Sequence, residues 1–85
     1  METHKFMQAV LAEYISARHK YSAFNSTHEG IAVIQEEVDE LWDLVKTNKG
    51  IKIPDEDTLM IKECIQIAAM AMAFVIDLSN NTKYI

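Results

Sequence analysis

Two glutamates on one face of an amphipathic segment are the residues of this chain best placed to do chemistry. Glu37 and Glu40 lie within HEGIAVIQEEVDELWDLV, residues 28–45. At 3.6 residues per helical turn, their row continues to Val33 on one side and to Leu44 on the other. Two carboxylates in an apolar row are costly unless they share a proton or bind a cation. The spacing therefore predicts half of a site for a hard divalent metal ion.

A second polar pair interrupts another apolar stretch. Glu63 and Gln66 are one helical turn apart, and the sequence CIQIAAMAMAFVIDL, residues 64–78, is otherwise almost wholly apolar. If the two segments pack as antiparallel helices, both pairs can meet inside a helical bundle. The candidate metal ligands are then Glu37, Glu40, Glu63 and Gln66.

The types of these side chains indicate which metal they would bind. Oxygen ligands without histidine or cysteine suit Mg²⁺, or Mn²⁺, better than zinc or copper. Mg²⁺ often binds through a few carboxylates together with the phosphates of a substrate, which predicts a phosphate ester or anhydride as the substrate. Taken alone, Glu37 and Glu40 also fit a solvated acidic helix face.

Three helices must position these residues, and we expect them at residues 3–20, 27–48 and 56–79. Ser26-x-x-Glu29 has the pattern of a capping box at the start of the second helix. Gly50 and Pro54 are typical of a helix end followed by a new helix start. No strand-like alternation is present, so the predicted class is all-α.

The distribution of apolar residues predicts how the helices pack. Residues 64–78 are apolar on nearly every side, which indicates a central helix. This run of 15 residues is shorter than the roughly 20 needed to cross a bilayer. Two further helices can hardly cover such a helix, so we expect a homodimer or homotetramer to complete a four-helix-bundle-type core. The stripe expected to face that core consists of Ile31, Ile34, Val38, Leu41, Trp42 and Val45.

Length and charge limit the classes of function. A chain of 85 residues is expected to be one domain, residues 1–85. Its net charge of -5 and its lack of a Lys/Arg cluster argue against nucleic-acid and membrane partners. The single Cys64 excludes an intramolecular disulfide and a cysteine-based zinc site. The N-terminus lacks the pattern of a secretion signal, so we expect a cytoplasmic protein.

The two polar pairs resemble the metal motif of the MazG-like, all-α nucleotide pyrophosphohydrolases. That motif is Glu-x-x-Glu on one helix and Glu-x-x-Asp on the next. Glu37-Val38-Asp39-Glu40, within EEVDEL, matches the first half, and Glu63-Cys64-Ile65-Gln66 matches the second except for its last residue. The similarity covers the second and third predicted helices and is that of a small single-domain branch.

The resemblance implies a Mg²⁺-dependent hydrolysis of nucleoside triphosphates to a monophosphate and pyrophosphate, in a dimer or tetramer. Glu37, Glu40 and Glu63 would bind the metal, while Glu36, together with Glu37, is the candidate for orienting or deprotonating the attacking water. Gln66 departs from the motif, because an amide can coordinate through oxygen but contributes no charge and cannot act as a base. A catalytically decayed helical oligomerisation or nucleotide-binding module is therefore the alternative, and base and sugar preference stay open.

Three further residues are candidates for substrate contacts. His28 near the positive end of the second helix could contact a base or phosphate, or could be an ordinary surface histidine. Phe24 could cover a nucleobase, or could anchor its loop onto the core. Lys62 could reach a phosphate, or could simply be solvated.

Overall fold

The computed structural model describes residues 1–47 and 56–80, which form three α-helices. They are α1 (Thr3–Lys20), α2 (Thr27–Thr47) and α3 (Glu56–Asn80). The described ends agree with the predicted bounds to within one residue, and the all-α class is confirmed. The predicted helix end around Gly50 and the helix start at Pro54 lie outside the described residues.

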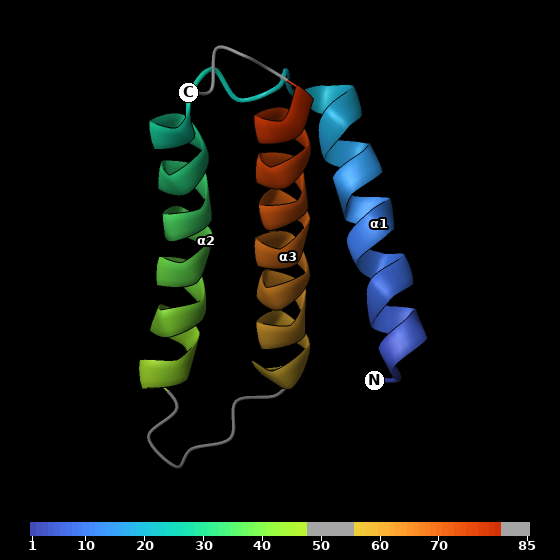
Figure 1. Ribbon diagram of the computed structural model, residues 1–85. Helices are drawn as coiled ribbons and strands as arrows, with labels where there is room; N and C mark the ends of the chain where they lie inside the picture. The colour runs from blue at the N-terminus through green and yellow to red at the C-terminus, as the bar shows by residue number, and fades with distance from the viewer. Residues whose placement is uncertain (48–55, 81–85) are drawn as a thin grey trace.

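The three helices lie side by side, with α3 between α1 and α2 (Figure 1). The chain runs along α1, turns through residues 21–26, returns along α2 and then runs back along α3, so α2 and α3 are antiparallel as predicted (Figure 1). Both outer helices pack on α3 and contact each other little. The result is essentially one layer of helices, 47 × 26 × 20 Å in extent.

The short turn between α1 and α2 is held by local hydrogen bonds. The Tyr21 N–H donates to the Ala17 carbonyl at 2.8 Å and ends α1. Ser26 Oγ accepts the Glu29 N–H at 3.1 Å, which is one half of the predicted capping box. The Glu29 carboxylate accepts from the N–H of Asn25 at 3.3 Å and from its side-chain amide at 3.2 Å. The Ser26 hydroxyl and the Glu29 carboxylate, at the start of α2, therefore both have hydrogen-bond partners within the turn.

The core of the single chain is small. Among the described residues, the buried apolar ones are Val10 on α1 and Ala69 and Ala73 on α3. The two alanines let neighbouring helices approach the middle of α3 closely. One charged side chain, Asp77, is buried with them at 6% exposure.

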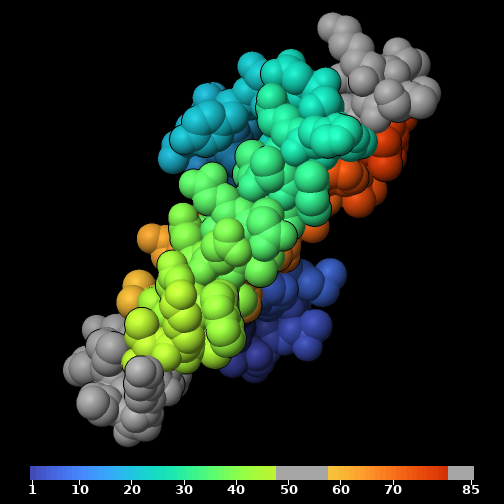
Figure 2. All heavy atoms as spheres, turned by 90° about the vertical axis from the view of Figure 1, so that its left-hand side faces the viewer, coloured from blue at the N-terminus to red at the C-terminus, as the bar shows by residue number. Residues whose placement is uncertain are grey.

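The orientation of α2 differs from the prediction. Ile34 and Leu41 of the predicted core stripe are half-buried, but Trp42 is 58% exposed. Glu37 and its apolar neighbours Val33 and Leu44 are half-buried as well. A helix at the edge of a single layer has one neighbour only, so it can bury one of its two apolar rows. Figure 2, which faces α2, shows this helix uncovered along its outer side. We call the exposed residues the outer stripe: Ile31, Val38, Trp42 and Val45.

Within the described residues, one helical segment, Thr58–Asn80, is long and apolar enough to cross a membrane by length and composition. It is longer than the run of 15 residues on which the sequence argument rested. A mostly buried core helix of a soluble protein meets the same criterion; α3 lies between the other two helices (Figure 1), and 11% of the segment is buried within the single chain.

Candidate metal centre and adjoining pocket

The structure brings three carboxylates together between α2 and α3. Glu37 and Glu40 are one turn apart on α2, and Glu63 faces them from the antiparallel α3. One oxygen of each lies within 4.8 Å of one oxygen of each of the others. We call this group the three-carboxylate cluster. The cluster joins the pair Glu37 and Glu40 to Glu63, the acidic member of the second pair. This agrees with the prediction made from the spacing in the sequence.

The cluster contains buried oxygens without a partner. Glu37 Oε2 and Glu63 Oε2 are shielded from solvent and accept no hydrogen bond. Such atoms are costly in a folded protein unless a donor or a cation satisfies them. Glu40 is exposed, so the cluster is open to solvent on one side and a phosphate can reach it.

The electrostatics of the cluster favour a bound proton or cation. Burial raises the pKa of Glu37 to about 7, together with the hydrogen bond that its protonated form can make with Glu63 and with repulsion by neighbouring carboxylates. Hydrogen bonding to Glu63 and the charge of Glu63 are the main causes that raise the pKa of Glu40. No lysine or arginine is ion-paired to any of the three carboxylates among the described residues. Their repulsion is therefore left for a proton or a metal ion to relieve.

The three oxygens are close enough to converge on a small divalent cation. Opposite ligands of an octahedral Mg²⁺ site lie about 4.2 Å apart, so oxygens that lie within 4.8 Å of one another need only a small inward movement to hold it. All three donors are carboxylate oxygens, which Mg²⁺ and Mn²⁺ prefer over softer ligands. The solvent-facing side at Glu40 leaves room for waters and phosphate oxygens in the remaining positions.

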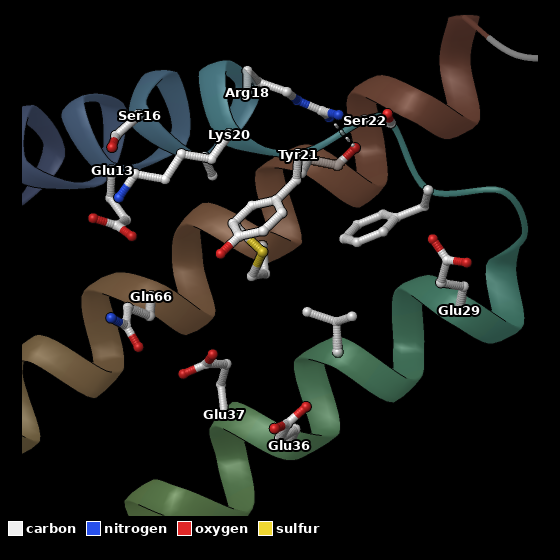
Figure 3. A pocket seen from close by; sticks show the side chains of 15 residues that line it. Glu13, Ser16, Arg18, Lys20, Tyr21, Ser22, Glu29, Glu36, Glu37 and Gln66 are labelled. Atoms are coloured by element: carbon white, nitrogen blue, oxygen red, sulfur yellow. Dashed lines mark hydrogen bonds between the residues drawn. The ribbon is translucent and has the colours of Figure 1, made fainter.

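Gln66 lies beside the cluster. It is half-buried on α3, one turn beyond Glu63. Gln66 and Glu37 line the same end of a pocket (Figure 3). Its place is thus compatible with a ligand or a neighbour of the metal, but it adds no negative charge.

Gln66→Asp is expected to strengthen Mg²⁺ binding roughly tenfold or more, because a fourth carboxylate would then face the site. Titration calorimetry at pH 8 measures the change. Glu2→Gln, which removes an exposed carboxylate before α1, should leave the affinity unchanged. Equal affinity in Gln66→Asp and the parent protein would place Gln66 outside the metal site.

A pocket of about 590 Å³ adjoins the cluster and shares Glu37 with it. Its walls come from the end of α1, the turn after it, the first half of α2 and the middle of α3 (Figure 3). The apolar part of the lining consists of Phe24, Val33, Met70 and Ala73. The polar part includes Glu13, Arg18, Lys20, Glu29, Glu36, Glu37 and Gln66. The pocket therefore joins an apolar floor to a predominantly acidic rim.

The predicted substrate-contact residues separate into two groups. Phe24 is half-buried and lines the pocket, and the exposed Glu36 lines it as well. His28 and Lys62 are exposed and are not part of the pocket lining. Their positions favour the alternatives of a surface histidine near a helix start and a solvated lysine.

Sequence reasoning missed an ion pair behind the pocket. Arg18 Nη2 lies 2.7 Å from Asp77 Oδ1, and Arg18 Nη1 donates to Asp77 Oδ2 at 3.1 Å. The same Oδ2 accepts the Phe24 N–H at 2.9 Å. The available signal was that Asp77 is the one acidic residue in the apolar run 64–78.

In comparisons with known proteins, the chain matches no family model, no curated protein and no solved structure. Its own residues and geometry therefore carry the functional argument.

Proposed function

We propose that this protein is a Mg²⁺-dependent nucleoside triphosphate pyrophosphohydrolase that releases a nucleoside monophosphate and pyrophosphate. The observation that carries the proposal is the three-carboxylate cluster at the edge of the pocket, with Glu37 common to both. The resemblance of EEVDEL and its partner motif to the MazG-like family supports the same reaction class.

Glu37, Glu40 and Glu63 would hold the metal ion. Bound there, Mg²⁺ or Mn²⁺ would neutralise phosphate charge during cleavage of the anhydride. Glu36 lies on the exposed rim of the pocket, where its carboxylate can orient a water molecule from the solvent side. Glu37 would serve mainly as a ligand, because a carboxylate that binds the metal is a poorer base.

The pocket would receive the nucleoside and leave the phosphates at the metal. Phe24, Val33 and Met70 provide an apolar surface on which a base can lie. The carboxylates around this surface would repel a triphosphate that entered it. The triphosphate therefore has its favourable place at the metal-loaded cluster, with the nucleoside directed towards the end of α1.

We further propose that two copies associate through the outer stripe of α2 and that the protein works in the cytoplasm without a nucleic-acid or membrane partner. The stripe is apolar, includes a largely exposed tryptophan and continues along most of α2. In a symmetric pair, each copy would cover the face that the other leaves open.

Gln66 favours one alternative, a MazG-like module that keeps the pocket but has lost catalysis. With three carboxylates instead of four, metal affinity falls, and a nucleotide could then bind without being cleaved. Such a module would show nucleotide binding and self-association without turnover.

Pyrophosphate release from a panel of ribo- and deoxyribonucleoside triphosphates tests the proposal. We expect turnover with Mg²⁺ or Mn²⁺ that a chelator abolishes. Glu40→Gln should reduce this turnover roughly 100-fold or more, since it removes a charged ligand with almost no change in shape. Glu2→Gln, the same change at an exposed residue before α1, is the matched control and should retain full activity. Absence of turnover on every nucleotide, by folded protein, would make the decayed module the better assignment.

A further inference from the structure

We propose that Asp77 positions one wall of the pocket. This wall consists of Tyr21, Ser22 and Phe24, and we call it the pocket wall. These residues line the pocket from the turn between α1 and α2. The functional part of this inference, that the wall shapes a nucleoside site, rests on the proposed function. The structural part is independent of it.

Asp77 is the point where the wall is joined to α3. Its side chain is 6% exposed, and both of its oxygens are used. One oxygen receives Arg18 Nη2, while the other receives Arg18 Nη1 and the N–H of Phe24. The two interactions with Arg18 form a bidentate pair between its guanidinium and the carboxylate. This geometry fixes the orientation of the carboxylate. Asp77 thus fixes both a side chain from α1 and the backbone of the wall.

Arg18 extends this connection along α3. Its Nη2 also donates to the Ala73 carbonyl at 3.0 Å, one turn before Asp77. Its guanidinium carbon lies 5.0 Å from the centre of the Tyr14 ring, within the range of a cation–π contact. The arginine is therefore held from two sides, and its charge is used by Asp77 instead of being presented to the pocket.

The interactions of Asp77 converge on the pocket. Arg18, Phe24 and Ala73 all belong to its lining. Figure 3 shows Arg18 and Tyr21 on the side of the pocket opposite Glu36 and Glu37. Asp77 itself is fourteen residues beyond Glu63 on α3, about 21 Å along the helix axis. It therefore lies far from the cluster and acts on the opposite wall.

Direct packing of α1 against α2 does not hold this wall in place. The two helices, which it connects, pack on α3 but contact each other little. The bonds from Tyr21 to Ala17 and from Asn25 to Glu29 are local and define only the two ends of the turn. The bond from Phe24 to Asp77 spans 53 residues and joins the wall directly to α3. Without it, the position of the wall would depend on a short turn whose two helices are held only through α3.

Asp77→Asn tests the inference, because it keeps the shape of the side chain and removes its charge. We expect the Phe24 amide to exchange with solvent roughly tenfold faster or more, while amides in the middle of α2 and α3 keep their protection. Asp43→Asn, an exposed aspartate on α2 with the same change in charge, should leave the Phe24 amide unaffected.

Ligand binding provides the second measurement. For α,β-imido deoxynucleoside triphosphates with Mg²⁺, we expect Asp77→Asn to weaken binding roughly tenfold or more. Binding of Mn²⁺ alone should be unchanged, because the cluster does not contact Asp77. A purely structural role would instead weaken both, since general loosening of α3 would also move Glu63.

The outcomes separate this inference from the proposed function. If the parent protein binds none of these nucleotides, the proposed function fails, and the exchange of the Phe24 amide still decides whether Asp77 holds the wall. Unchanged exchange in Asp77→Asn would overturn the positioning role, as would equal loss of Mn²⁺ and nucleotide binding. Should Asp77→Asn fail to fold, Arg18→Lys keeps the charge and removes the bidentate pair. Arg18→Lys should then increase the exchange rate of the Phe24 amide by less than the tenfold expected for Asp77→Asn, and it should leave Mn²⁺ binding unchanged. An unchanged exchange rate would overturn the proposal.

Discussion

Glu37→Gln is expected to raise the midpoint of thermal unfolding of the metal-free protein by several degrees at pH 8. The parent carries three carboxylates within 4.8 Å of one another, and the substitution removes one charge from the most buried side of the group. Relief of repulsion and of unfavourable burial stabilises the folded state. The same substitution should remove most of the stabilisation that Mg²⁺ gives to the parent, because a ligand is lost. Scanning fluorimetry with and without Mg²⁺ measures both effects.

The size of the effect depends on pH. The pKa of Glu37 is raised from an ordinary value of 4.5 to about 7 in the folded protein. Between these values the folded state binds more protons than the unfolded state, so the free energy of unfolding falls as the pH rises. Above pH 7 the loss is complete, and below pH 4.5 the two states are equally protonated at this position. The advantage of Glu37→Gln should therefore be large at pH 8 and nearly absent at pH 4.5.

A matched control separates repulsion in the cluster from the general effect of net charge. Glu2→Gln makes the same change at an exposed residue before α1, and it should not alter the response to Mg²⁺. If Mg²⁺ shifts the unfolding of neither the parent nor Glu37→Gln, the cluster is not a metal site. Destabilisation by Glu37→Gln at pH 8 would show that its carboxylate has a favourable partner.

The helices and the cluster could be predicted because both depend on local patterns. Periodicity and the turn chemistry around Ser26 determine where α2 begins. Glu37 and Glu40 share a face for the same reason. An antiparallel neighbour with a glutamate at a similar level then places Glu63 opposite them, which needs only the order and the length of the helices.

The face that α2 turns towards α3 could not be predicted in the same way. Its sequence has two apolar rows, one through Val33 and Leu44 and one through Val38 and Trp42. Periodicity ranks the second row as the stronger, but a single chain offers α2 only one neighbour. The half-buried side of α2 takes Val33, Glu37 and Leu44 from the first row, together with Ile34 and Leu41 from the edge of the second. The rest of the stronger row, the outer stripe, is left on the surface.

The ion pair of Arg18 with Asp77 was also beyond the reach of sequence patterns. The two residues are 59 positions apart, and no periodicity within α1 or α3 relates them. An aspartate within an apolar run does indicate that a partner must exist, since a buried carboxylate without one is costly. The identity of that partner depends on how α1 crosses α3, which is a tertiary property.

Trp42→Glu is expected to convert the associated protein to a monomer at micromolar concentration and to raise the dissociation constant roughly 30-fold or more. Tryptophan at the centre of an apolar face commonly dominates the energy of an interface. The glutamate would in addition place two carboxylates against each other near the axis of a symmetric pair. Sedimentation velocity over a range of concentrations measures the change.

The exposed apolar side chains of α2 support a second copy as the occupant of the outer stripe. Ile31 is 53% exposed, Val38 38%, Trp42 58% and Val45 44%. A second copy offers an identical apolar stripe of the same length, so each copy can cover the other without any further surface.

Met7→Glu distinguishes the outer stripe from exposed apolar surface in general. Met7 on α1 is 64% exposed, and its replacement adds the same charge away from α2. Association should persist in this variant and be lost in Trp42→Glu. Equal loss in both variants would assign the interface to another face, and a parent protein that is monomeric at high concentration would refute self-association. Because the outer stripe lies on a different side of α2 from Glu37, monomeric Trp42→Glu should still bind Mg²⁺, which separates assembly from the metal site.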